Sequence, residues 1–125
     1  MATRFIGKGN LGDAPTLKQV EVKGEKRPVA ELRVYFDRLV PEGDDDFVDK
    51  GGFWLNVSYW GSRGETAARL LCKGARVRVE GVLVEHQWED GETGEARSRL
   101  ELIADDITLD LGRVESFILR QKNGD

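Results

Sequence analysis

The side chains with the most distinctive chemistry in this sequence are three tryptophans, Trp54, Trp60 and Trp88, and a set of arginines between and after them. An indole ring can stack on a flat aromatic ligand, and a guanidinium group can pair with a phosphate or a carboxylate. Large aromatic residues also dominate protein cores, and taken alone the three tryptophans are better explained as core than as a binding surface. Both explanations stay open at this point.

Residues suited to catalysis or metal binding are scarce. His86 is the single histidine and Cys72 the single cysteine, so neither a metal cluster nor a paired nucleophile and base is indicated. Cys72 follows two leucines in a helical pattern and is expected to pack in the core. Residues 7–12 (GKGNLG) fit the G-x-G-x-x-G pattern, but the helix that a dinucleotide site needs does not follow. We therefore expect no enzyme activity, no cofactor and no metal.

The charge of the chain is unevenly distributed. Residues 41–50 hold five acidic residues against one lysine, a local charge of −4 that equals the net charge of the whole chain. The remainder is therefore neutral overall, and the acidic decade is predicted to be a solvated loop. No apolar run approaches the ~20 residues of a membrane span. The N-terminus lacks a hydrophobic signal core, so we expect a cytoplasmic protein with no membrane partner.

Alternating apolar and polar residues predict a chain made mostly of strands. The predicted extended segments are residues 4–22 with a bend, 29–36, 53–60, 76–80, 82–88, 97–102 and 107–109. Gly81 interrupts one alternation, as a bulge does. Residues 65–73 predict the single helix, with Ser62 as its N-cap and Gly74 as its stop.

This order predicts an all-β fold: a five-stranded Greek-key barrel with one short helix between strands three and four. A half-open sandwich with a stray helix fits the same order. We expect one domain over residues 1–112 and a short C-terminal tail over residues 113–125.

The alternation also assigns side chains to faces. Trp54 and Trp60 fall on the strand face opposite Leu55, Val57 and Tyr59. Outward positions on successive predicted strands hold five arginines, Arg33, Arg76, Arg78, Arg97 and Arg99, while Lys8 and Lys18 lie near the loop after the first strand. Outward charges are normal on a half-exposed sheet, so these cations are either solvated or part of a phosphate-binding surface.

Four motifs in order resemble the bacterial single-stranded DNA-binding protein family. They are residues 9–15 (GNLGDAP), the strand from Trp54 to Gly61, residues 65–81 (ETAARLLCKGARVRVEG) and residues 88–90 (WED) before a glycine-containing turn. The resemblance covers about residues 4–110. It implies an OB-fold that binds single-stranded DNA without sequence preference, in DNA replication, recombination or repair.

The resemblance also implies roles for residues. Trp54, Trp60 and Trp88 fall where the family places base-stacking aromatics, and the arginines and lysines named above would contact phosphates. Family subunits pair near residues 4–9, which places Phe5 and Ile6 at an interface of a homotetramer or, as second choice, a dimer.

Two departures from the family stand out. The family often has a further stacking tryptophan where this chain has Val40, with Phe36 or Phe47 as substitutes. The usual acidic tail tip that recruits replication and repair proteins is not found, so recruitment of that kind is not expected.

A second class of function is a protein-interaction module on the same fold, such as a primosome or mobile-element accessory protein. The acidic balance of the chain and the residues Glu85, His86 and Gln87 favour this alternative. It predicts tryptophans that are buried without DNA.

Overall fold

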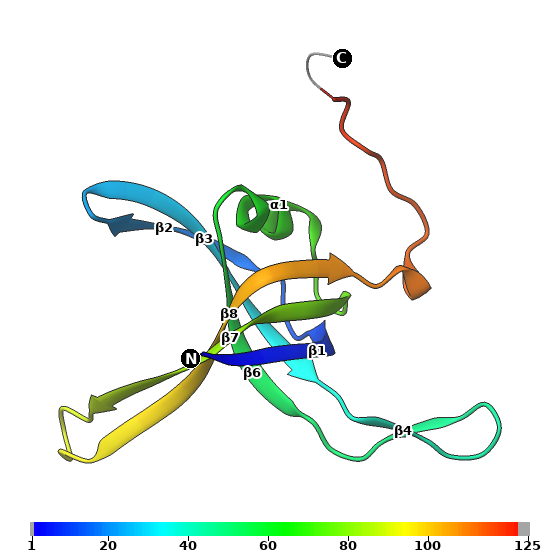
Figure 1. Cartoon of the computed structure of the whole chain (residues 1–125), viewed down its shortest axis with the longest axis horizontal. Coiled ribbons are helices and arrows are strands. Elements are labelled where there is room, and N and C mark those ends of the chain that lie inside the picture. The colour runs from blue at the N-terminus through cyan, green and yellow to red at the C-terminus, as the bar shows by residue number, and fades with distance from the viewer. Residues whose placement is uncertain (1, 123–125) are drawn as a thin grey trace.

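The structure is a computed structural model that describes residues 2–122 (Figure 1). Within these residues the strands are β1 (Thr3–Leu11), β2 (Thr16–Val22), β3 (Glu25–Phe36), β4 (Leu39–Pro41), β5 (Phe47–Asp49), β6 (Phe53–Trp60), β7 (Arg76–Glu89) and β8 (Ala96–Leu109). The helix α1 (Ser62–Leu70) lies between β6 and β7, and a short 3-10 helix, η1 (Leu111–Arg113), follows β8.

Five of these strands close a ring. β1 pairs with β7, β7 with β8, β8 with β6, β6 with β3, and β3 again with β1. All of these pairs are antiparallel except β6–β8, which is parallel. A closed five-stranded ring of this kind is the architecture of an OB-fold barrel, so the half-open sandwich is not formed.

The expected mostly β structure with one α-helix is confirmed, and although five strands close the barrel, the expectation of five strands in all is wrong. The described residues form eight strands, because β2 extends the sheet beside β3 and because β4 and β5 form a separate hairpin. The acidic decade at residues 41–50 is therefore not a plain loop. Apolar residues on either side of its acidic centre pair as Val40 with Val48 and Pro41 with Phe47, which leaves Glu42 and residues 44–46 at the turn, while Asp49 ends β5.

The barrel interior is filled by the inward side chains of the ring strands. The buried set is Leu11, Leu32, Val34, Phe36, Leu55, Val57, Tyr59, Val77, Val79 and Leu102, with Ala30, Ala67 and Ala104 beside them. The predicted facing of β6 is confirmed, since Leu55, Val57 and Tyr59 are buried while Trp54 and Trp60 are exposed.

The predicted bulge in β7 is confirmed by a shift of the β7–β8 register between Glu80 and Gly81. A Cβ atom on Gly81 would lie 2.1 Å from the carbonyl oxygen of Ile103, so a larger residue does not fit there without movement of the backbone. The bulge bends β7 and sends its second half out of the barrel with β8.

Helix α1 differs from its prediction at both ends. Its N-cap is Gly61, with a φ of 85° and no side-chain cap bond, so the prediction of Ser62 as N-cap is wrong. The helix ends at Leu70, and Gly74 lies in the turn that follows, where its amide donates to the carbonyl of Leu11. Because the helix stops before Cys72, this side chain leaves the helical face and is exposed; its predicted core position is wrong.

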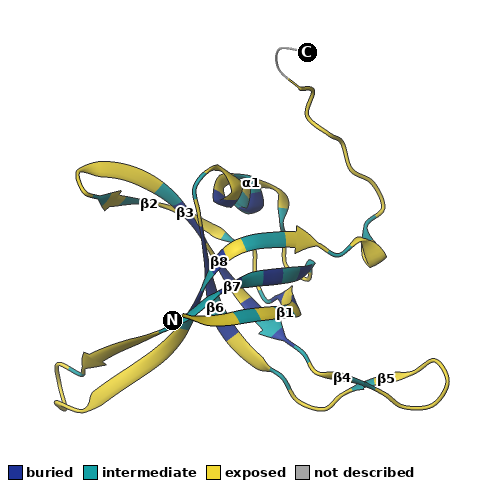
Figure 2. Cartoon of the chain, in the orientation of Figure 1, coloured by how far each residue is buried: buried dark blue, intermediate teal, exposed yellow. Residues whose placement is uncertain are grey.

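Three hairpins project from the barrel, formed by β2–β3, β4–β5 and β7–β8 (Figure 1). Their outer parts are exposed, whereas the buried residues gather where the strands cross in the barrel (Figure 2). After η1, residues 114–122 run away from the barrel without regular secondary structure, and the last three residues of the predicted tail, 123–125, lie outside the described residues. No helix within residues 2–122 is long and apolar enough to cross a membrane.

Candidate functional site

The outward side chains of β3, β6, β8 and the outer half of β7 form one surface, here called the aromatic face. It carries Arg33 and Tyr35 from β3, Trp54, Asn56, Ser58 and Trp60 from β6, Arg97, Arg99 and Glu101 from β8, and His86 and Trp88 from β7. Cross-strand register places these residues on the same side, since opposite residues in a ladder point the same way. Tyr35 lies opposite Trp54, and Trp88 lies opposite Arg97.

All three tryptophans are partly exposed on this face. The exposed fraction is 46% for Trp54, 39% for Trp60 and 46% for Trp88. A core tryptophan would be almost fully buried, so the core explanation does not apply to these residues. Each of the three rings therefore offers surface to a ligand.

Trp54 is fixed by contacts on several sides. The Tyr35 ring lies 5.3 Å from the Trp54 ring, centroid to centroid, and the guanidinium carbon of Arg33 lies 5.4 Å from the Trp54 ring centroid. Arg33 is in turn held by Asn56, whose Oδ1 accepts a 3.0 Å hydrogen bond from Nη1. A Cβ atom on Gly12 would lie 2.6 Å from the indole, so the loop after β1 closes on this ring only because residue 12 is a glycine.

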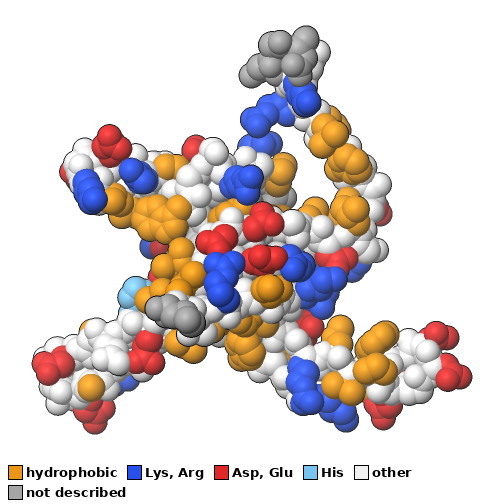
Figure 3. Space-filling model, in the orientation of Figure 1, with side chains coloured by type: hydrophobic (Ala, Val, Ile, Leu, Met, Phe, Trp, Pro, Cys, Tyr) orange, Lys and Arg blue, Asp and Glu red, His pale blue; other side chains and the backbone are white. Residues whose placement is uncertain are grey.

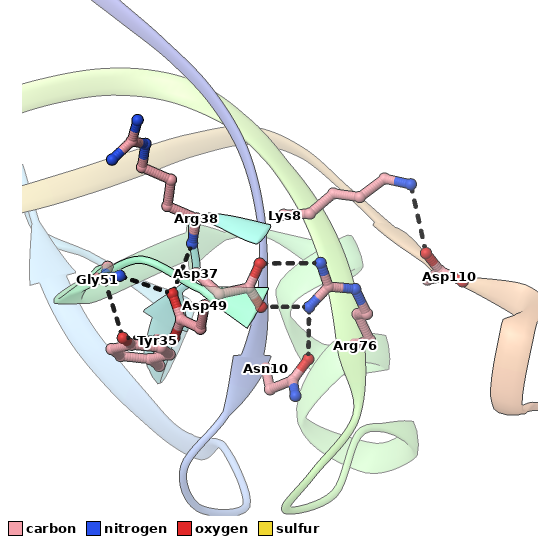
Figure 4. A network of polar contacts seen from close by, with 10 residues as sticks. Lys8, Asn10, Tyr35, Asp37, Arg38, Asp49, Gly51, Arg76 and Asp110 are labelled. Atoms are coloured by element: carbon pink, nitrogen blue, oxygen red, sulfur yellow. Dashed lines mark hydrogen bonds and ion pairs between the residues drawn. The ribbon is translucent and has the colours of Figure 1, made fainter. Parts of the chain in front are cut away.

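The β4–β5 hairpin is tied to the strand beside Trp54 (Figure 4). The Tyr35 hydroxyl donates to Asp49 Oδ2 at 2.9 Å, while the amides of Arg38 and Gly51 donate to Oδ1 at 3.1 and 3.0 Å. The hydrogen bonds from the Arg38 amide, the Tyr35 hydroxyl and the Gly51 amide lower the pKa of Asp49 below its ordinary value. The same contact with Asp49 raises the pKa of Tyr35. The hairpin base is therefore held in place next to the tryptophan.

A carboxylate lies in the middle of the aromatic face. Glu101 accepts a 2.6 Å hydrogen bond from Ser58 Oγ and lies 2.8 Å from His86 Nε2, so it joins β6, β7 and β8. Partial burial raises the pKa of Glu101, but the hydrogen bonds from Ser58 and His86 and the charge of Arg99 outweigh it and lower the pKa overall. The group is ionised near neutral pH, and its charge is offset by these donors.

Two of the predicted cations lie beside this carboxylate. Arg33 and Arg99, from β3 and β8, line a small pocket of about 250 Å³ together with Asn56, Ser58 and Glu101. Within residues 2–122, neither arginine forms an ion pair at 4.0 Å or less. Both guanidinium groups therefore remain available to an anionic ligand.

Two further predicted cations lie close to the other tryptophans but have acidic partners. Arg97 Nε lies 2.9 Å from Asp90 Oδ2 beside Trp88, and Lys18 Nζ lies 3.2 Å from Glu31 Oε2. Val29 on β3 pairs with Lys18 on β2 and with Trp60 on β6, so the three residues lie in line across the sheet. These pairs are exposed and weak, so each cation can change partner at little cost.

The remaining predicted cations lie elsewhere, on the outer face of β1 and β7. Figure 4 shows two of them, Lys8 and Arg76. Their acidic partners are Asp37 for Arg76, at 2.5 and 3.1 Å, Asp110 for Lys8, at 3.3 Å, and Glu80 for Arg78, at 2.6 Å. Arg76 and Asp37 are also largely buried side chains. The structure thus does not bring Lys8, Arg76 and Arg78 together with the tryptophans.

Several residues of the face were not singled out in the sequence. Tyr35 is two residues from Arg33 and Asn56 is two residues from Trp54, so both occupy outward positions of the same alternation. The sequence pattern could therefore have identified them. The Ser58–Glu101–His86 contact depends on the pairing of β6 with β8, which no local pattern shows. Of the two substitutes for the missing tryptophan, Phe36 is wrong because its inward position on β3 buries it to 3% exposure, whereas Phe47 is 64% exposed.

A closed five-stranded barrel with half-exposed tryptophans beside arginines on its outer face belongs to the class of barrels that bind single-stranded nucleic acid. A sequence model of the Single-strand binding protein family matches residues 3–110, and the chain belongs to this family. Proteins of this family are non-enzymatic DNA-binding proteins, which confirms the prediction that the chain is not an enzyme.

Two individual proteins illustrate the relationship. Single-stranded DNA-binding protein 1 of Chlorobaculum tepidum is 30% identical over 63 residues, which cover 50% of this chain and 38% of that protein. The crystal structure of a small single-stranded DNA-binding protein from Streptomyces coelicolor superposes with a TM-score of 0.76 at 18% identity, covering 91% of this chain and 99% of the other. The structural likeness establishes the shared fold.

Proposed function

We propose that this chain binds single-stranded DNA without sequence preference, by stacking bases on Trp54, Trp60 and Trp88. The observation that carries the proposal is the partial exposure of all three indoles on one face that also presents Arg33 and Arg99, neither of which forms an ion pair within 4.0 Å among residues 2–122. Each stacked base contributes about 1–3 kcal/mol with little dependence on its identity, because every base has a flat π-face.

The spacing of these groups suits an extended strand. Trp54 and Trp60 are six residues apart on β6, or about 20 Å at the rise of a β-strand. Arg33 lies opposite Asn56, between Trp54 and Trp60 along β6, and Arg99 lies opposite His86, two residues before Trp88 on β7. A duplex would keep its bases paired and stacked internally, so it would gain only the phosphate contacts.

We also propose that the chain forms a homo-oligomer through β1, a tetramer in preference to a dimer. Residues 3–8 pair with β7 on one side only, since the β1–β3 pairing within the described chain covers Gly9 to Leu11. Ile6 on this open edge is 60% exposed, and a second β1 can satisfy the free backbone groups. Such an assembly would serve DNA replication, recombination or repair in the cytoplasm.

A protein-interaction module is the second candidate function. It is favoured by the acidic groups interleaved on the aromatic face, Glu31, Asp90 and Glu101, and by the net charge of −4. A peptide with basic and aromatic residues would complement such a surface without any DNA.

A tryptophan-fluorescence titration separates the two. We expect oligo-dT to quench the fluorescence strongly and the matching duplex to quench it weakly, with affinity for oligo-dT falling as salt rises. Absence of binding to oligo-dT at low salt would refute the proposal and leave the interaction module as the better account.

A further inference from the structure

A small pocket lies in the aromatic face between Trp54 and Trp60. On β6 the outward positions between these two tryptophans belong to Asn56 and Ser58, and both line the pocket, whose volume is about 250 Å³. The other polar side chains that line it come from β3, from β8 and from the loop after β1. A strand whose bases stack on both tryptophans therefore passes over this pocket.

The face that holds the pocket is flanked by two projecting hairpins. The β2–β3 hairpin lies beside Trp60, and the β7–β8 hairpin carries Trp88. Figure 3 shows both hairpins projecting to the same side of the molecule, with hydrophobic side chains in the angle between them. A strand bound between the hairpins is thus confined to a course over the pocket.

The charges of the pocket suit a neutral base better than a phosphate. Three carboxylates and two guanidinium groups line it, those of Asp13, Glu31, Glu101, Arg33 and Arg99. Even with Glu31 paired to Lys18, the cations only balance the acids, so the pocket has no net positive charge to hold a phosphate. Its volume is below the range of about 300–1,000 Å³ that is typical of pockets for drug-sized ligands, so it suits a single ring system.

The open acceptor positions on Glu101 favour one particular base. Its two oxygens accept from Ser58 Oγ at 2.6 Å and lie 2.8 Å from His86 Nε2, which leaves about two of the roughly four acceptor positions of a carboxylate. Among the DNA bases, only guanine has two adjacent donors, N1–H and the N2 amine, on its Watson–Crick edge. Thymine has its N3–H between two carbonyl oxygens, which a carboxylate repels.

We propose that this pocket takes up one base of the bound strand and prefers guanine. Glu101 accepts from N1–H and from the N2 amine, while Arg33 donates to O6 and N7, the most common specific contact of arginine with guanine. Asn56 pairs with Arg33 on β3 and with Glu101 on β8, so the two residues flank it at about 10 Å from each other, two strand spacings, which leaves room for a base. Asn56 Oδ1 occupies one of the five N–H donors of Arg33, at 3.0 Å, and the others are left for the base.

This inference rests on the proposed function, because stacking on the tryptophans must first hold the strand over the pocket. It adds a preference at one position to binding that accepts any base elsewhere. Arg99, which lies opposite His86 on the side of Trp88, is left for a phosphate of the same strand.

The test is fluorescence anisotropy with an oligo-dT of about nine nucleotides, within the roughly 4–16 nucleotides of one OB-fold, and with the same oligonucleotide carrying one central guanine. We expect the wild type to bind the guanine-containing strand at least about fivefold more tightly. Inosine at the same place keeps N1–H, O6 and N7 but lacks the N2 amine, so most of the preference should be lost. Both comparisons use the wild-type protein and so do not depend on the fold of a variant.

A pair of variants tests the carboxylate itself. Glu101→Gln replaces one of the two acceptor oxygens by a donor, so the preference for guanine should disappear. The matched control is Glu85→Gln, which removes the same charge from the other side of the β7–β8 hairpin, where Glu85 lies opposite Leu100. This control should keep the wild-type ratio of the two affinities.

Equal affinity of the wild type for oligo-dT and for the guanine-containing strand would overturn the inference and leave base stacking intact. A preference that inosine or Glu101→Gln retains in full would also overturn it, because Glu101 would then not recognise the base. Absence of binding to either oligonucleotide would instead refute the proposed function, and the inference with it.

Discussion

Replacement of Trp54 by alanine gives the most direct test of base stacking. Its ring is 46% exposed, so about half of its surface is open to a base. We therefore take the low end of the stacking range, about 1–1.5 kcal/mol. Since 1.4 kcal/mol is about tenfold in affinity, the Kd for oligo-dT should rise roughly 5- to 13-fold.

The same substitution also costs stability, which has to be separated from the binding effect. A tryptophan buries roughly 150–250 Å² when fully covered, and about half of this area is covered here. At about 25 cal/mol per Å² the loss of folding free energy is about 2 kcal/mol. A domain of this size tolerates this loss of folding free energy. The binding assay therefore needs a control variant that loses a similar amount of stability.

Phe53 supplies that control. It is the neighbouring aromatic on β6, it is 50% exposed, and it packs on the opposite face against Phe5 and Phe36 at centroid distances of 6.1 and 6.0 Å. Phe53→Ala should lower stability to a similar extent and leave the affinity for DNA within twofold of wild type.

The assay is fluorescence anisotropy of a labelled oligo-dT of about 16 nucleotides, the upper end of the site size of one OB-fold. Urea unfolding of both variants gives the matching stabilities. If Trp54→Ala binds oligo-dT within twofold of wild type, or if both variants lose affinity equally, the stacking argument is wrong.

Three further predictions rest on other parts of the site. Arg99→Gln should reduce the slope of log K against log salt by about 0.7, the contribution of one single-strand phosphate contact, and a slope equal to that of wild type would remove Arg99 from the site. Gly12→Ala should weaken DNA binding with all tryptophans present, because its Cβ would meet the Trp54 ring at 2.6 Å; unaltered affinity would show that the ring adapts. Glu101 has a pKa below its ordinary 4.5 in the folded state, so it contributes stability above that pH that is lost as the pH falls through the lower folded pKa. In urea unfolding, Glu101→Gln should therefore show a smaller loss of stability on acidification than wild type, and an identical pH profile would contradict the hydrogen-bond argument.

The sequence by itself determined which way many side chains point. Strict alternation along residues 53–60 placed Trp54 and Trp60 outside and Leu55, Val57 and Tyr59 inside, and the structure agrees. Gly81 marked the bulge, because a glycine inside an alternating segment is a local signal. A strand repeats every two residues, so facing can be inferred without knowing the neighbours of the strand. The family motifs were local as well, and they predicted the family that the chain belongs to.

The ends of elements were less predictable. The helix ended at Leu70 and not at Lys73, which exposed Cys72. The acidic decade is part of a hairpin because Val40 pairs with Val48 across the turn. In both cases the bounds of the element depend on strand pairing and side-chain packing, which can override local conformational preference. The local sequence pattern carries no information about these contacts.

Only the tertiary structure decided which cations share a surface with the tryptophans. Arg33 and Arg76 look alike in the sequence, since both are outward arginines on predicted strands. Closure of the ring brings β8 beside β6, which places Arg99 near Arg33, whereas Arg76 comes to lie beside Asp37 at the end of β3. Strand neighbours are set by contacts between residues far apart in the chain, and the two-residue period that reveals the face of a side chain carries no information about them.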